Sequence, residues 1–141
     1  MKTQPHPVDP QPIGSAHAAA GLSWLAQMAA TDKWNLSADE VVDLLGGMPV
    51  RTYHDLKRKA LAGQPVSLSR DTLERLSLLL GIHKALQIIV PSGRPDLVYA
   101  WFNQANENPI FANRSIKEYL LQRKSIEALY VVRRYLDSAR G

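Results

Sequence analysis

Two capping boxes constrain the fold of this chain more than any other feature of its sequence. Ser37 is followed three residues later by Glu40, and Ser115 is followed in the same way by Glu118. In a capping box the serine hydroxyl and the glutamate carboxylate satisfy free amides at the start of a helix. Apolar residues recur at helical spacing after each box, and no stretch alternates as a strand would. The sequence therefore predicts an all-α fold.

Capping residues, helix-ending glycines and apolar periodicity together place the helices along the chain. They start near residues 15, 37, 50, 69, 95, 115 and 125. Residues 1–14 hold four prolines and almost no apolar side chain, so we expect a flexible tail there. Gly81, inside the long fourth helix, predicts a close helix crossing or a kink. We expect Leu80 and Trp101 to be buried in a core shared by the whole chain.

The C-terminal part combines a loop with a basic closing helix. Residues 104–113 are rich in asparagine, and we expect an ordered loop pinned by Ile110 and Phe111. The closing helix carries three arginines near its end, which are Arg133, Arg134 and Arg140. Two interpretations stay open at this point. The arginines stabilise the negative end of the helix dipole, or they enter a partner's pocket for an anionic ligand.

Several classes of protein are excluded by what the sequence lacks. With no cysteine, neither a disulfide nor a thiolate metal site is possible. No apolar run is long enough to span a membrane, and the N-terminus lacks the apolar core of a signal peptide. We therefore expect a soluble, cytoplasmic protein.

Catalytic motifs are equally sparse. The four histidines show no metal-ligand spacing, and no glycine-rich phosphate loop or paired carboxylate is visible. His83 could act as an acid–base group, but a place on a helix face is the simpler interpretation. We expect no enzymatic activity, no cofactor and no metal.

Positive charge gathers in two segments of the chain. Residues 51–59 carry a net charge of +3 and residues 114–141 carry +4, while the whole chain has only +4. The remaining residues are therefore slightly acidic. Two separate basic surfaces favour acidic partners, nucleic acid above all.

Residues 37–61 match the helix-turn-helix arrangement. A helix over 37–45 is followed by the turn Gly46–Pro49 and by a helix over 50–61 with a basic outer face. In this motif the second helix enters the major groove of DNA. Three residues would face base edges and three would approach phosphates: Arg51, Thr52 and Asp55, then Lys57, Arg58 and Lys59. The alternative is a helical hairpin with a solvated, charged face, and the pattern alone leaves both open.

Four segments between Trp34 and the C-terminus carry a resemblance to a known family. They are LSADEVVDLLGG, LSRDTLERLSLLLGIHKALQIIV, AWFNQANENPIFANRSIKEYLL and VRRYLDSARG. In this combination the chain resembles the Xre/MbcA/ParS antitoxins of bacterial type II toxin–antitoxin pairs. The sequence departs from that family after Phe111, where Asn113 stands roughly in the place of a glycine. Asparagine tolerates left-handed backbone better than most residues, so we expect the turn to survive.

The resemblance implies both a partner and a mode of action. The partner would be a toxin of the RES fold that consumes NAD, and a dimeric antitoxin would cover the toxin's active site with its C-terminal region. Through its helix-turn-helix the antitoxin would also bind operator DNA and repress the shared operon. Carried over to this chain, the toxin contacts come from the loop and the closing helix: Asn108, Phe111, Arg133, Arg134, Tyr135 and Arg140.

The expected organisation is an all-α fold of two parts that share a compact helical core. After the tail, residues 15–66 form the helix-turn-helix DNA-binding domain, and residues 67–141 form the toxin-binding and dimerisation domain. A second interpretation is a stand-alone helix-turn-helix transcriptional regulator whose C-terminal helices serve dimerisation or sensing. A third is an interaction module without a role at DNA.

Overall fold

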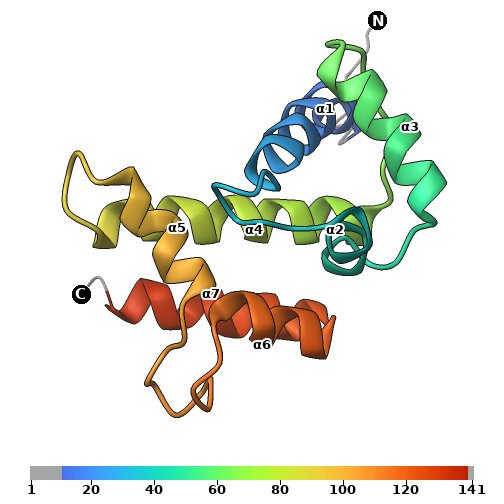
Figure 1. Cartoon of the computed structure of the whole chain (residues 1–141). Helices are drawn as coiled ribbons and strands as arrows, with labels where there is room; N and C mark the ends of the chain where they lie inside the picture. The colour runs from blue at the N-terminus through green and yellow to red at the C-terminus, as the bar shows by residue number, and fades with distance from the viewer. Residues whose placement is uncertain (1–10, 140–141) are drawn as a thin grey trace, which may run out of the picture.

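Helices account for all the regular structure of the described residues. The computed structural model describes residues 11–139, and seven helices follow one another along this range (Figure 1). They are α1 (Gln11–Met28), α2 (Ala38–Leu44), α3 (Val50–Leu61), α4 (Arg70–Ile89), α5 (Pro95–Asn103), α6 (Ile116–Arg123) and α7 (Ile126–Ala139). One isolated bridge pairs Ala105 with Ser115, and no strand forms within residues 11–139. The prediction of an all-α fold is confirmed.

The central helix of the fold is α4. In Figure 1 it crosses the middle of the molecule, with α1 and α3 on one side and α6 and α7 on the other. It packs along α7 and also against α1 and α5, while α2 contacts both α3 and α6. The helix-turn-helix part and the C-terminal helices thus share one core through α4. In the described part of the chain, no helix is long and apolar enough to cross a bilayer.

Side-chain caps begin four helices where the sequence predicted them, the last of them α7 at Ser125, whose hydroxyl accepts from the amide of Ala128 at 3.2 Å. Ser37 and Ser115 each accept a hydrogen bond from the amide three residues further on. In return, the carboxylates of Glu40 and Glu118 accept a hydrogen bond from the amide of each serine, at 2.9 Å in both cases. Ser69 caps α4 with its hydroxyl in the same way. These local signals fix the starts of α2, α4, α6 and α7.

The first helix starts earlier than predicted. Its first residue is Gln11, so four residues of the expected tail belong to α1. Pro12 is compatible with this start, because the amide it lacks has no partner in the first turn of a helix. The rest of the expected tail, residues 1–10, lies outside the described residues.

Because α4 is buried on two faces, its core residue is Leu79 and not the neighbouring Leu80, which the sequence predicted. Leu79, Ile82 and Leu86 are fully buried, whereas Leu80 is half buried near α1. A helix between two layers buries more than one stripe, so its apolar pattern does not mark a single centre. Trp101 is also only half buried, packed against the core from α5. The prediction that Leu80 and Trp101 are buried core residues is wrong.

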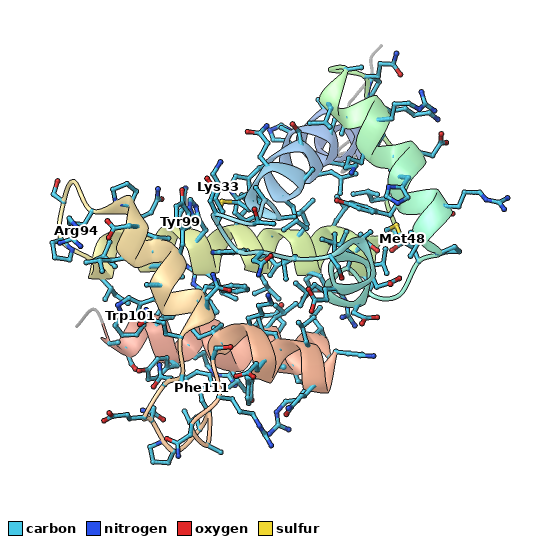
Figure 2. All side chains as sticks on the ribbon, viewed as in Figure 1. Lys33, Met48, Arg94, Tyr99, Trp101 and Phe111 are labelled. Carbon is cyan, nitrogen blue, oxygen red and sulfur yellow. The ribbon has the colours of Figure 1, made fainter. Side chains whose placement is uncertain are left out.

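The loop between α5 and α6 is held by one aromatic side chain (Figure 2). Phe111 is fully buried and meets the rings of Tyr119 and Tyr135 edge to face, with 5.2 Å between centroids in each pair. Ile110, the other expected anchor, is 45% exposed, so the prediction fails for this residue. Asn113 has a φ of 66°, the left-handed backbone expected there.

The segment between α1 and α2 joins the two parts of the fold. Trp34 is fully buried and stacks on Phe102 of α5, with 4.0 Å between ring centroids. It also meets Trp24 of α1 at 5.5 Å and His83 of α4 at 6.0 Å. The side-chain amide of Asn103 donates to a backbone carbonyl of the same segment at 2.8 Å. These contacts make the two parts one packed body.

A close crossing of α4 and α7 occurs at Gly81. A Cβ atom on Gly81 would lie 1.7 Å from Nη1 of Arg133, so only glycine leaves room for this guanidinium. On its own helix, Nε of Arg133 donates to Asp137 at 3.1 Å. The close crossing predicted at Gly81 is confirmed, and Arg133 is part of it.

Candidate nucleic-acid interface and partner-binding helix

The turn between α2 and α3 is fixed from α4. Gly46 and Gly47 have φ angles of 104° and 95°, a left-handed backbone that glycine adopts without steric cost. A Cβ atom on Gly46 would lie 2.7 Å from Oδ2 of Asp71 on α4. The hydroxyl of Thr72 donates to the carbonyl of Leu45 at 3.0 Å in a buried contact. These contacts give α3 one defined direction out of the turn.

One side of α3 is polar and faces solvent, while the other packs on the core. Tyr53 and Ala60 are buried on the inner side. Four exposed residues share the outer side at spacings of three and four: Arg51, His54, Asp55 and Arg58. Together with Thr52 and Leu56 they line a groove of about 620 Å³. His54 was not predicted as a site residue, although its spacing from Arg51 would have indicated it.

The charged side chains of α3 are held in place by contacts within the helix itself. Asp55 forms an ion pair with Arg58 and another with Lys59, at 3.9 Å. The ammonium of Lys57 lies 5.5 Å from the centroid of the Tyr53 ring. Burial raises the pKa of the Tyr53 hydroxyl, so this ring stays neutral beside the lysine.

The structure thus brings all six predicted DNA residues together on one helix. Arg51, Thr52, Asp55 and Arg58 are exposed. Lys57 and Lys59 are half buried along the sides of α3. The two ion pairs and the contact between Lys57 and Tyr53 leave a face with more cations than anions, as contact with a phosphate backbone requires.

Arg75 of α4 links the turn between α6 and α7 to the helix-turn-helix part. The side chain of Arg75 is 13% exposed, and its Nε donates to Asp71 at 2.9 Å. Its Nη1 donates to the carbonyl of Lys124 at 3.0 Å. Lys124 ends α6 with a φ of 55°, and its ammonium pairs with Asp43 of α2 at 3.4 Å. The C-terminal helices therefore touch the DNA-reading part beside the glycine turn.

Two of the residues predicted to contact a toxin hold the fold together. Phe111 is fully buried, and Arg133 lies on Gly81 with its guanidinium. Tyr135 is half buried with its ring against Phe111. Arg134 is exposed on the outer side of α7.

The other predicted partner contacts lie in the loop and at the chain end. Asn108 is half buried, and its side-chain oxygen accepts a hydrogen bond from the amide of Ile110 at 3.0 Å. The asparagine thus shapes the loop that carries Phe111. Arg140 lies outside the described residues.

A second groove, not predicted from the sequence, lies beside Trp101. It has a volume of about 350 Å³, and its lining includes Leu97 and Trp101 of α5 and Glu107 of the loop (Figure 2 labels Trp101). It combines apolar surface with a carboxylate next to the loop expected to contact a partner. Its residues follow one another in sequence from α5 into the loop, and Leu97, Ala100 and Trp101 recur at helical spacing, so the sequence carried a signal for this surface.

The histidine and acidic side chains of the described residues do not gather into a metal site. No cluster of three or more histidine, cysteine or acidic side chains within residues 11–139 has metal-binding geometry. His83 packs against the rings of Trp24 and Trp34, and burial lowers the pKa of its imidazole. This agrees with the interpretation of His83 as a packed helix residue.

A basic helix presented by a glycine turn after a short capped helix defines a helix-turn-helix DNA-binding protein. Comparison with known families agrees: residues 14–81 match the antitoxin Xre-like helix-turn-helix domain. The chain is also 37% identical over 128 residues to the uncharacterized protein y4oB of Sinorhizobium fredii (strain NBRC 101917 / NGR234), covering 90% of this chain and 89% of that protein. No solved structure matches. The chain belongs to the same family as y4oB, and its residues 14–81 match a helix-turn-helix domain of antitoxins, a class of protein whose partners are in general DNA and a toxin.

Proposed function

We propose that this antitoxin neutralises a RES-type, NAD-consuming toxin of a type II pair and represses the shared operon as a homodimer. The observation that carries the proposal is the exposed basic side of α3, set by the turn at Gly46 in a chain whose residues 14–81 match an antitoxin domain. Arg51, Thr52 and Asp55 would then face base edges, with His54 added by its position. Lys57, Arg58 and Lys59 would approach phosphates.

The toxin-binding role is proposed for the exposed side of the C-terminal part. The inner face of α7 packs on α4, so contacts with a toxin must come from its outer residues and from the neighbouring loop. NAD carries a pyrophosphate, and a pocket for it is itself basic. We therefore expect Arg134 and Arg140 to pair with acidic groups at the catalytic centre or its rim, with Tyr135 and Asn108 beside them. Phe111 and Arg133 would act indirectly by holding these residues in place.

Co-expression with the toxin tests this part of the proposal. The toxin to use is the product of the reading frame adjacent to that of the antitoxin. We expect the native chain to protect growth and to be recovered in complex with the toxin. Arg134→Ala should lose about tenfold or more in toxin affinity, because a desolvated charge pair loses much when one partner is removed. Lys84→Ala is the matched control, since Lys84 is exposed on α4.

The outcomes separate the proposal from its alternative. If Arg134→Ala binds the toxin as tightly as the native chain does, α7 is not part of the toxin interface. If the native chain fails to bind or neutralise any product of the neighbouring frame, yet binds its own upstream DNA, it acts as a stand-alone regulator.

A further inference from the structure

An uncharged groove lies where α1 meets the end of α3. Its volume is about 720 Å³, and its lining includes Ala16, Ala20, Trp24 and Gln27 of α1, with Ala60 and Pro65 from α3 and the segment after it. In Figure 1 this end of the molecule lies on the far side of α4 from α6 and α7.

Lack of charge distinguishes this groove from the two other grooves described above. None of its lining residues is charged, whereas the groove on α3 carries Arg51, Asp55 and Arg58 and the groove on α5 carries Glu107. The 18 residues of α1 include no aspartate, glutamate, lysine or arginine, although 21% of the whole chain is charged. Ala16, Ala20 and Gln27 are exposed on α1, so the solvent-facing side of this helix offers a surface without such a charge to a partner.

We infer that a second copy of this chain covers the groove, with α1 of each copy packed on the other across a two-fold axis. Near such an axis each residue faces its own counterpart, so any charged residue there would meet a like charge. Neutral alanine, tryptophan and glutamine side chains avoid this repulsion, and burying them leaves no ion without a partner.

The position of the groove on α3 leaves the DNA-reading side free. Ala60 lines the groove from the inner side of α3, about 180° around the helix from Arg51 at roughly 100° per residue. A copy docked on α1 therefore does not cover Arg51 or Arg58. This arrangement presents two reading helices at once, as a dimer bound to two half-sites needs. The inference rests on the proposed function, because it names the contact surface of the homodimer proposed above.

Charge also decides between this groove and the one beside Trp101 as the surface for self-association. At a two-fold axis through the groove on α5, Glu107 of one copy would approach Glu107 of the other. An exposed pair of Arg94 and Asp96 lies at the start of the same helix. Such a mixed surface suits a different protein with its own complementary charges. The self-contact is therefore assigned to α1.

Self-association of the full chain, measured by analytical ultracentrifugation over a range of concentrations, tests the inference. Ala20 is exposed, so Ala20→Glu adds a charge to the groove without entering the core. We expect the native chain to be a dimer and Ala20→Glu to weaken the dimer about a hundredfold, with an unchanged melting temperature of the monomer. Mixing Ala20→Glu with Ala20→Lys should restore a dimer, because the facing charges become opposite. Ala105→Glu, in the groove on α5, should dimerise like the native chain.

A monomeric native chain, or a dimer that survives in Ala20→Glu and breaks in Ala105→Glu, would overturn the inference. Toxin capture keeps this test apart from that of the proposed function. Ala20→Glu should still bind the toxin as a monomer, because the groove lies away from α7. If the native chain dimerises through α1 but captures no toxin, the proposed toxin partner is wrong and the dimer surface stands.

Discussion

The helices α3 and α7 both carry basic side chains, but they use them differently. The basic residues of α3 lie on or beside its exposed side, while Tyr53 and Ala60 make the core contacts. In α7, Arg133 is itself a packing residue that fits onto Gly81. A basic helix therefore leaves its charged side chains free for a partner only where apolar side chains make all of its core contacts. The predictions below test this contrast between a free and a partly occupied basic helix.

The largest effect is expected from Phe111→Ala. This side chain is fully buried between two tyrosine rings, so its loss should lower the free energy of unfolding by about 3–5 kcal/mol. Chemical denaturation measures this loss. Ile110→Ala, at the exposed neighbouring residue, should change stability by no more than about 0.5 kcal/mol. Equal effects for the two variants would mean that Phe111 does not anchor the loop.

Next in size is the change at the glycine turn. Gly46→Ala combines a left-handed φ with a clash against Asp71, whereas Gly47→Ala has the left-handed φ but open space. Each should cost about 1–3 kcal/mol in backbone strain. Only Gly46→Ala should also shift α3 and so weaken DNA binding further, as measured by fluorescence anisotropy. Matching DNA affinities for the two variants would show that α4 does not set the direction of α3.

A pH effect is expected at the aromatic junction between the two parts. Burial lowers the pKa of His83 in the folded chain below about 6.5, so the unfolded chain takes up the proton more readily. Folding stability should therefore fall as the pH drops through about 6.5. The melting temperature at about pH 7.5 and pH 5.5 measures this, and His83→Gln should reduce the dependence. An identical pH profile for the variant would assign the effect to other groups.

The smallest effect is expected from the ion pair that joins α2 to the end of α6. Lys124 and Asp43 are separated by 3.4 Å, but 58% of the lysine side chain is exposed. Solvent screening limits such a pair to about 0.2–1 kcal/mol, and Asp43→Ala should lose no more than this. A larger loss in thermal denaturation would indicate that the contact between the two parts depends on this pair rather than on Arg75.

Local signals explain what was predictable in this chain. Both capping boxes, the cap at Ser69 and the bounds of the helix over 50–61 depend on neighbouring residues, and the structure has them as expected. The roles of Phe111 and Arg133 depend instead on Tyr135 and Gly81, which are distant in sequence. Their types and spacing fit a partner contact as well as they fit internal packing, so only the fold distinguishes the two.

The most direct test of the central claim is a salt titration of binding to the DNA upstream of the antitoxin's own reading frame. If the basic side of α3 contacts phosphates, the logarithm of the binding constant falls linearly with the logarithm of salt concentration. Lys57→Ala should make this slope shallower by about one unit, and Arg51→Ala should relax the preference for one base. Lys84→Ala on α4 should leave the slope unchanged. Native slope and native sequence preference in both α3 variants would contradict the assignment of α3 as the DNA-reading helix.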